Sequence, residues 1–450
     1  MERQSYSRPS KIAKTNSKGA GATPRTRPDG SPIDNDRVEI GPTPKAFAEL
    51  IQRGIELPDL TKMREARLAR LVKQIQKRDL DGVLLFDPLN IRYATDSTNM
   101  QLWTAHDFTR ACFVSAEGYI VLWDFVRCEH LTEHLPLINE RRSGAANLYF
   151  CYGDKEFDQA KIVAGEFFDV IVSHCADKKS IRVGVDKMEF SVAFALRDLG
   201  VDLHSGMAVL EHARLIKTVD EIKAMRCAIT ACEISVGEMQ DALAPGITEV
   251  ELWSHLHAAN IARGGEWIEA RLLASGPRTN PWMQEAGPRK IAAGDLVGFD
   301  TDLIGLYGMC CDMSRTWLCG DVAASEEQKT LYQIAYDHIH ENIELFKPGT
   351  SFRELTFGGH QLPQACKAQR YCVKMHGVGL CDEFPAIYYP EDYIEGAFDY
   401  NLEPGMIFSV EAYIGKVGGR DGVKLEDQVL VTDDGYEKLT HYPHDEKLMG

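Results

Sequence analysis

The chain has no apolar stretch close to the roughly 20 residues that a membrane-spanning helix needs. Its N-terminus also lacks the pattern of a secretory signal, in which a charged start precedes an apolar centre and a small-residue cleavage site. From these two absences we expect no membrane association and a cytoplasmic location.

The sequence contains twelve cysteines but no C-x-x-C pair. Zinc sites built on thiolates usually draw on such pairs, and disulfide frameworks belong to short secreted chains. The scattered cysteines therefore exclude a Cys-rich zinc site and a disulfide scaffold, and we expect reduced thiols.

Positive charge is in short supply, since 50 Lys and Arg residues stand against 67 Asp and Glu residues, a formal net charge of −17. Nucleic-acid binding requires Lys and Arg to displace counterions from phosphate, and anionic lipid attracts basic surfaces. The excess of acidic residues therefore disfavours binding to nucleic acid and to anionic lipid. It suits a small cationic or zwitterionic substrate.

The length of 450 residues predicts two domains. Residues 1–45 are rich in Ser, Thr, Pro, Gly and basic side chains without apolar periodicity, which indicates a flexible N-terminal arm. Residues 46–214 show helix and strand patterns, including a buried strand at Val83–Phe86 and a hairpin at 110–125, and are expected to form an α/β domain. Residues 215–450 form the second domain, which carries the dense chemistry.

The second domain contains an internal sequence repeat. A hydroxyl residue followed three positions later by Glu or Gln is typical of a helix start. Such pairs occur at Thr218–Glu221, Thr248–Glu251, Ser325–Gln328 and Ser351–Glu354. The segments "LAPGITEVEL" and "FKPGTSFREL" match most visibly. We interpret this repeat as a duplication that produces two α+β halves facing each other.

Each half is followed by acidic residues in strand-like sequence. Together with a glycine-flanked histidine, the set is Asp300, Asp302, Asp312, His376, Glu411 and Glu426. Asp300 and Asp302 are two positions apart, so on a strand they would share a face. One such acid alone would fit the exposed end of an amphipathic strand. Several in apolar sequence are costly unless paired or metal-bound, and the oxygen-rich set favours one or two divalent ions such as iron, manganese or cobalt.

The motifs around these residues resemble the pita-bread superfamily of methionine aminopeptidases, prolidases, aminopeptidase P and creatinase. They include "DGVLLFDPLNIRYAT" near the N-terminus and "HGVGL" with "LVTDDGYEKLT" near the C-terminus. The resemblance covers residues 60–450. It implies an α/β (α+β) chain with a creatinase/prolidase-like N-terminal domain and a C-terminal pita-bread domain with pseudo-twofold duplication. The metal ligands it implies are Asp300, Asp312, His376, Glu411 and Glu426.

Three positions depart from the peptidases of this superfamily. Trp282 and Asp382 stand where peptidases carry histidines, and Asp302 is an additional acid. These departures resemble the DddP-type dimethylsulfoniopropionate lyases. That resemblance implies an iron site of six residues that includes Asp302, and Asp382 as the general base. The implied reaction cleaves dimethylsulfoniopropionate, a zwitterionic sulfonium, to dimethyl sulfide and acrylate, and we expect a homodimer.

Several alternatives stay open from the sequence. Glu383 is a rival base beside Asp382. A sulfonium needs an aromatic wall, for which Tyr371, Trp103 and Trp282 are candidates, although core packing also accounts for the two tryptophans. The runner-up functions are a metallopeptidase of the Xaa-Pro type, like prolidase or aminopeptidase P, and an inactive pita-bread interaction module.

Overall fold

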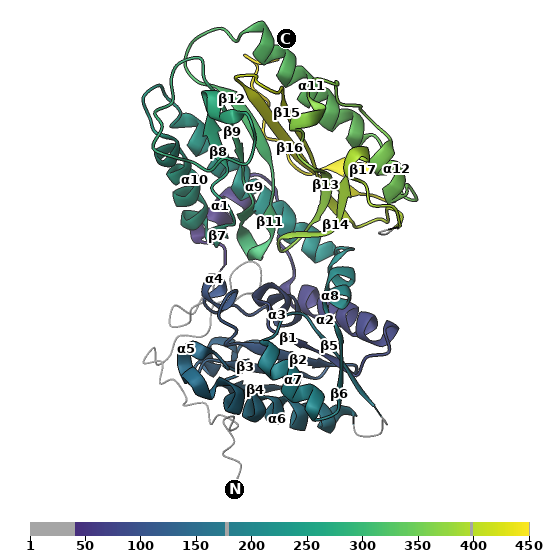
Figure 1. Ribbon diagram of the computed structural model, residues 1–450. Coiled ribbons are helices and arrows are strands. Elements are labelled where there is room, and N and C mark those ends of the chain that lie inside the picture. Colours follow the sequence, from purple (N-terminus) through teal and green to yellow (C-terminus); the bar gives the residue numbers. More distant parts are fainter. Residues whose placement is uncertain (1–40, 176–179, 397–398, 450) are drawn as a thin grey trace. The chain divides into compact units, whose positions relative to one another are not determined.

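The computed structural model describes residues 41–175, 180–396 and 399–449 (Figure 1). The described chain forms two compact units, one of residues 59–214 and one of residues 41–58 with 215–449. No helix in these described ranges is both long enough and apolar enough to cross a bilayer. All twelve cysteines are free thiols.

The first unit is built on a six-stranded mixed sheet in the order β4-β3-β2-β1-β5-β6. Its strands are β1 (Gly82–Leu85), β2 (Ala111–Ser115), β3 (Ile120–Asp124), β4 (Glu140–Ser143), β5 (Ile181–Val185) and β6 (Val201–Ser205). Its α-helices are α2 (Leu60–Lys77), α3 (Pro88–Thr95), α4 (Gln101–Thr104), α5 (Tyr149–Tyr152), α6 (Glu156–Cys175), α7 (Phe190–Asp198) and α8 (Met207–Arg214). The central strand β1 is buried along its whole length, and β2 and β3 form the predicted hairpin, so the α/β prediction is confirmed.

The second unit contains a large antiparallel sheet in the order β14-β13-β15-β16-β12-β9-β8, with β17 paired to β16, and a small sheet in the order β11-β10-β7. Its α-helices are α1 (Pro44–Gln52), α9 (Val219–Asp241), α10 (Glu249–Arg263), α11 (Glu326–Ile343) and α12 (Phe352–Phe357). Its strands are β7 (Trp267–Ile268), β8 (Leu273–Ser275), β9 (Leu296–Asp300), β10 (Leu303–Ile304), β11 (Cys310–Cys311), β12 (Ser314–Leu318), β13 (Val373–Val378), β14 (Asp382–Tyr388), β15 (Ile407–Gly415), β16 (Gly422–Val431) and β17 (Tyr436–Lys438).

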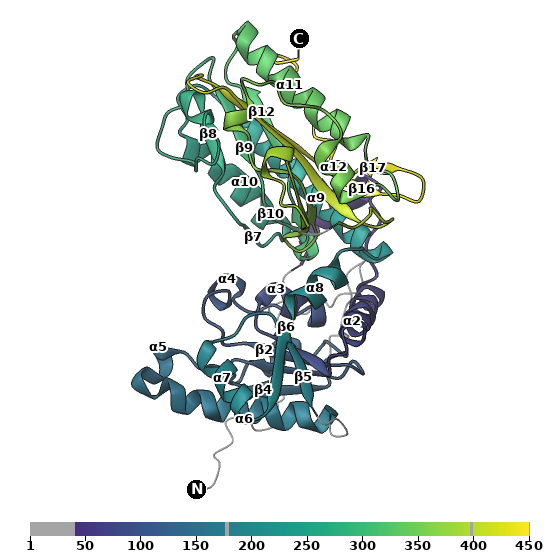
Figure 2. The same ribbon diagram turned by 45° about the vertical axis from the view of Figure 1, so that its right-hand side comes forward.

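The strand order of the large sheet confirms the predicted duplication. The earlier half contributes β8, β9 and β12, and the later half contributes β13, β15 and β16. The last strand of each half, β12 or β16, lies at the centre and pairs with its counterpart. All four predicted capping boxes form at the starts of α9, α10, α11 and α12. Helix α11 packs along β15 and β16 through its apolar face (Figures 1 and 2).

The predicted start of the first domain is wrong. Residues 46–58 belong to the second unit, because the apolar face of α1 packs against α9 and α10. The guanidinium of Arg263 also donates to both carboxylate oxygens of Glu49, at 2.8 and 2.9 Å. Helix α1 begins at Pro44, so the last residues of the predicted arm are helical or cap the helix. The rest of that arm, residues 1–40, lies outside the described residues.

Candidate metal centre

Four polar side chains form a row across the middle of the large sheet. Asp300 at the end of β9 is paired with Ser314 at the start of β12, which is paired with Glu426 of β16, which is paired with Glu411 of β15. Directly opposed residues on neighbouring strands point to the same face. Because every residue of these four strands is buried, the row lies in a dry environment.

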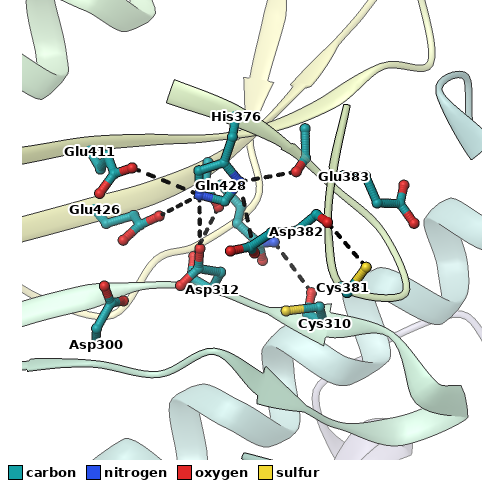
Figure 3. A network of polar contacts seen from close by, with 12 residues as sticks. Asp300, Cys310, Asp312, His376, Cys381, Asp382, Glu383, Glu411, Glu426 and Gln428 are labelled. Carbon is teal, nitrogen blue, oxygen red and sulfur yellow. Dashed lines mark hydrogen bonds and ion pairs between the residues drawn. The ribbon is translucent and has the colours of Figure 1, made fainter. Parts of the chain in front are cut away.

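His376 and Asp312 complete this row. His376 of β13 is paired with Ser409, two positions from Glu411 on β15, so its side chain reaches the same face. Its Nε2 atom lies 3.2 Å from Asp312 Oδ2, 3.6 Å from Glu426 Oε1 and 3.9 Å from Glu411 Oε1 (Figure 3). Its Nδ1 atom lies 3.0 Å from the carbonyl oxygen of Gly377. If Nδ1 carries the proton and donates there, the Nε2 lone pair faces the carboxylates, as a metal ligand requires.

Three carboxylate oxygens in this cluster have no hydrogen-bond partner among the described residues. Asp312 Oδ1, Glu411 Oε1 and Glu426 Oε1 are buried and accept no hydrogen bond from the described part of the chain. A buried carboxylate oxygen without a partner is costly. Ligand atoms of Asp312, His376 and Glu426 lie within 4.8 Å of one another, close enough to share one ion. The oxygen-rich donor set with one imidazole therefore fits a divalent transition metal.

Lys424 is the main site residue that the sequence reasoning missed. Its side chain is fully buried, and its ammonium lies 2.8 Å from Asp300 Oδ2, 3.0 Å from Glu411 Oε2 and 2.6 Å from Glu426 Oε2. Although burial opposes it, these carboxylates hold the pKa of Lys424 well above its usual value. The signal was present in the sequence, because Lys424 precedes Glu426 by two positions on a buried strand and so shares its face.

The opposite face of β16 is also charged. Asp427 pairs with Arg315 at 2.8 Å, and both side chains are fully buried. Arg315 also donates to the carbonyl oxygen of Glu426 at 2.8 Å. This contact fixes the backbone that carries the ligand, in the way that outer contacts orient metal ligands.

Asp302 reaches the acidic cluster by a route that the sequence did not predict. Strand β9 ends at Asp300, and Asp302 adopts a left-handed conformation with φ of 36°, so the two acids do not share a strand face. Ligand atoms of Asp302, Asp312 and Asp382 nevertheless lie within 4.8 Å of one another. Burial, followed by the charge of Asp300 and of Asp382, raises the pKa of Asp302 to about 9.

Asp382 begins β14, directly after the turn that follows β13. Its Oδ1 atom lies 3.8 Å from His376 Nδ1, and its side chain is 54% exposed. Glu383, the rival base, is turned away from the metal cluster and forms a buried ion pair with Lys217 at 2.8 Å (Figure 3). The geometry favours Asp382, since it faces both the cluster and solvent.

The three aromatic candidates have different surroundings. Tyr371 is partly buried and lies two residues before β13, the strand that carries His376; burial, with the charge of Glu411, raises its pKa. Trp282 lies under Lys424, whose ammonium is 5.5 Å from the ring centroid. Trp103 belongs to α4 of the first unit, where its ring lies 5.5 Å from that of Phe125. Its contact with substrate stays a prediction.

Comparison with known proteins agrees with this fold. Residues 67–226 match the creatinase/prolidase N-terminal domain, and residues 223–433 match metallopeptidase family M24. Among solved structures, a recombinant prolidase from Thermococcus sibiricus is similar with a TM-score of 0.67 at 22% identity, over 85% of this chain and 98% of that chain. Fold and site thus define a protein of the M24 pita-bread class.

Two curated relatives narrow this class. The dimethylsulfoniopropionate lyase DddP of Roseovarius nubinhibens is 50% identical over 427 residues, which cover 94% of this chain and 95% of the relative. The dimethylsulfoniopropionate lyase DddP of Roseobacter denitrificans is 48% identical over 427 residues, which again cover 94% of this chain and 95% of the relative. This chain belongs to the DddP family.

Proposed function

We propose that this protein is a metal-dependent carbon–sulfur lyase that cleaves dimethylsulfoniopropionate to dimethyl sulfide and acrylate. One observation carries the proposal: in a chain half identical to DddP lyases, the half-exposed carboxylate of Asp382 stands beside a cluster of metal-ligand residues. A hydrolase of this fold would need proton-transfer groups for a peptide at that position. A carboxylate base there suits an elimination.

The residues proposed to hold the metal are Asp300, Asp302, Asp312, His376, Glu411 and Glu426. When bound, the ion would act as a Lewis acid toward the substrate carboxylate and so make the neighbouring C–H bond more acidic. Lys424 holds three of the carboxylates together by contacts of 3.0 Å or less. Arg315 fixes the strand that carries Glu426.

Asp382 is the proposed general base. It takes the proton from the carbon next to the substrate carboxylate, the C–H electron pair becomes the new C=C bond, and the C–S pair leaves with sulfur. The products are acrylate and neutral dimethyl sulfide, and the proton passes from Asp382 to water. Partial burial raises the pKa of Asp382, and the negative charges of Glu426 and Asp300 raise this pKa further. The positive charge of His376 lowers it in part. A raised pKa makes the carboxylate a better base at neutral pH.

The sulfonium end of the substrate needs an electron-rich, apolar wall. Tyr371 is the preferred candidate, because it is partly buried and lies two residues before β13, the strand that carries His376. The indole ring of Trp282 already lies close to the Lys424 ammonium, which would compete with the substrate sulfonium for the face of the ring. Trp103 remains a proposal from the sequence alone.

A peptidase of the Xaa-Pro type is the second candidate, favoured by the likeness to the Thermococcus sibiricus prolidase. Incubation of the purified protein with dimethylsulfoniopropionate and, separately, with an X-Pro dipeptide distinguishes the two. We expect dimethyl sulfide and acrylate and no free proline. Release of proline without dimethyl sulfide would support the peptidase.

An inactive interaction module is the third candidate. It is disfavoured by the buried oxygens of Asp312, Glu411 and Glu426, which accept no hydrogen bond from the described residues and suit a cation. Metal analysis of the purified protein tests this. Stoichiometric transition metal is the expected result, and its absence after growth with iron, manganese and cobalt would favour the module.

We further propose iron as the metal, with manganese or cobalt as substitutes, because all three suit oxygen and imidazole ligands. A homodimer is proposed as well. It is supported by exposed aromatic side chains on the first unit, where Phe190 contacts both Phe157 and Phe194. Light scattering after size exclusion tests the dimer. The free cysteines support a reducing, cytoplasmic compartment.

A further inference from the structure

The turn that presents Asp382 is supported from its inner side by Glu383. Adjacent residues of a strand point to opposite faces, so Asp382 faces His376 while Glu383 points into the turn between β13 and β14 (Figure 3). Glu383 Oε1 accepts the backbone N–H of Leu380 at 2.9 Å. A Cβ atom on Gly379 would overlap the Glu383 carboxylate where it now lies. The carboxylate therefore fills the turn.

Lys217 neutralises this buried carboxylate. Its ammonium lies 2.8 Å from Glu383 Oε2, and the two side chains are 3% and 1% exposed. The backbone of Lys217 is itself anchored, because its N–H donates to the carbonyl oxygen of Gly405 at 2.8 Å. The pair thus ties the turn to the segment that precedes α9. Removing one partner of such a pair leaves an uncompensated charge, which is strongly unfavourable in a dry site.

A second contact holds the other side of the same peptide unit. The backbone N–H of Cys310, on β11, donates to the carbonyl oxygen of Gly379 at 2.8 Å. The Gly379–Leu380 peptide is therefore held on both sides, its carbonyl by β11 and its N–H by Glu383, and Asp382 follows two residues later facing the metal cluster.

We propose that Lys217 and Glu383 are positioning residues that hold Asp382 at the distance needed for proton removal, a role that rests on the proposed lyase function. Neither side chain faces the cluster, so neither is a metal ligand or a base. Their effect is on the placement of Asp382, and a displacement of about 1 Å in such a group lowers the rate by roughly a hundredfold.

The test compares Lys217→Met and Glu383→Gln with the wild-type protein in release of dimethyl sulfide, metal content and amide hydrogen exchange. We expect kcat to fall about 10- to 100-fold in both variants, with KM and metal content close to wild type. Exchange should accelerate in peptides that cover residues 379–383 and stay unchanged elsewhere. Glu383→Gln keeps the side-chain volume and one acceptor, so it should be the milder variant.

The matched control is Arg263→Met, which breaks another buried ion pair of the same unit, between Arg263 and Glu49. It should lower thermal stability without lowering kcat. Local exchange and kcat that stay at wild-type values in folded Glu383→Gln and Lys217→Met would overturn the positioning role, as would loss of metal in step with activity. If Lys217→Met does not fold, Glu383→Gln decides alone. A wild-type protein that releases no dimethyl sulfide refutes the lyase proposal itself, and normal local exchange in the variants refutes the positioning of the turn independently.

Discussion

Asp382 Oδ1 lies 3.8 Å from Nδ1 of His376, and a carboxylate oxygen of Asp382 also lies within 4.8 Å of those of Asp302 and Asp312. The other ring nitrogen, Nε2, lies 3.2 Å from Asp312 Oδ2. One imidazole therefore contacts the proposed base through Nδ1 and a proposed metal ligand through Nε2. Because Nδ1 also lies within hydrogen-bond distance of the Gly377 carbonyl, the orientation of the ring is fixed.

Replacement of the proposed base should separate catalysis from metal binding. In Asp382→Ala we expect dimethyl sulfide release to fall by a factor on the order of 10² to 10⁴, the usual contribution of a general base, with metal content unchanged. Headspace gas chromatography and elemental analysis on one preparation measure both. Asp433→Ala, which removes an exposed acid of the turn after β16, is the control. Loss of metal in Asp382→Ala would identify Asp382 as a ligand, a role its closeness to Asp302 and Asp312 permits.

Removal of a metal ligand should have opposite effects on activity and on the stability of the metal-free protein. Asp312→Asn is expected to lose most of its metal and its activity. Unfolding in the presence of a chelator should require at least as much denaturant as the wild type, because burial and the charges of Glu426 and Asp300 oppose ionisation of Asp312. A variant that is both metal-free and clearly less stable would show that Asp312 serves the fold more than the metal.

Much of the fold was predictable because local signals and tertiary packing agree. The four capping boxes mark helix starts, and the buried runs "LVGF" and "MIFSVEAYI" mark strands. The candidate ligands could be proposed from the sequence because a carboxylate in such an apolar run is costly unless a cation or a hydrogen bond compensates it. The backbone conformation at Asp302 was not predictable. The prediction that Asp300 and Asp302 share a face assumed a continuous strand, but β9 ends at Asp300. The role of α1 was hidden because its partners, α9 and α10, are distant in sequence.

Lys424 and Lys217 were missed for a related reason. A lysine in sequence is most often exposed, so the position of Lys424 two residues before Glu426 on one strand was not interpreted as a shared buried face. The pairing of Lys217 with Glu383 joins residues 166 positions apart, which no local pattern predicts.

Lys424 should stabilise the metal-free protein. Removal of its charge in Lys424→Met leaves Asp300, Glu411 and Glu426 without their common counter-charge, and we expect a loss of roughly 3–5 kcal/mol in unfolding free energy in the presence of a chelator. Saturating divalent metal should recover part of this loss. Lys416→Met, which removes a partly exposed ion pair with Glu327, should cost less than about 1 kcal/mol. Equal stability of the two variants under chelation would contradict this role.

Metal affinity should rise with pH. Burial raises the pKa of Glu411 to about 8 and that of Asp302 to about 9. Both exceed the values of an unfolded chain, so the folded protein binds more protons, and without metal its stability falls as pH rises from about 4.5 through about 9. Metal binding needs ionised ligands, so affinity increases over the same interval. Competition with a chromophoric chelator between about pH 6 and pH 9 measures this, and an affinity independent of pH would contradict it.

Tyr371 should contribute to substrate binding more than to the chemical step. A ring beside the sulfonium is worth about 0.5–2 kcal/mol, so Tyr371→Ala should raise KM by a factor of about 2 to 30. Tyr371→Phe, which keeps the ring, should stay close to wild type. Steady-state assays of dimethyl sulfide release measure both constants. A large fall in kcat for Tyr371→Phe would show that the hydroxyl takes part in proton transfer instead.

The central claim is that the metal cluster and Asp382 together carry out an elimination on dimethylsulfoniopropionate. Its most direct test is headspace detection of dimethyl sulfide from purified protein whose metal content has been measured. We predict catalytic release of dimethyl sulfide with acrylate in equal amount, abolished by chelation and restored by iron. A protein with its metal in place that turns over dimethylsulfoniopropionate without releasing dimethyl sulfide, or does not turn it over at all, would contradict the account.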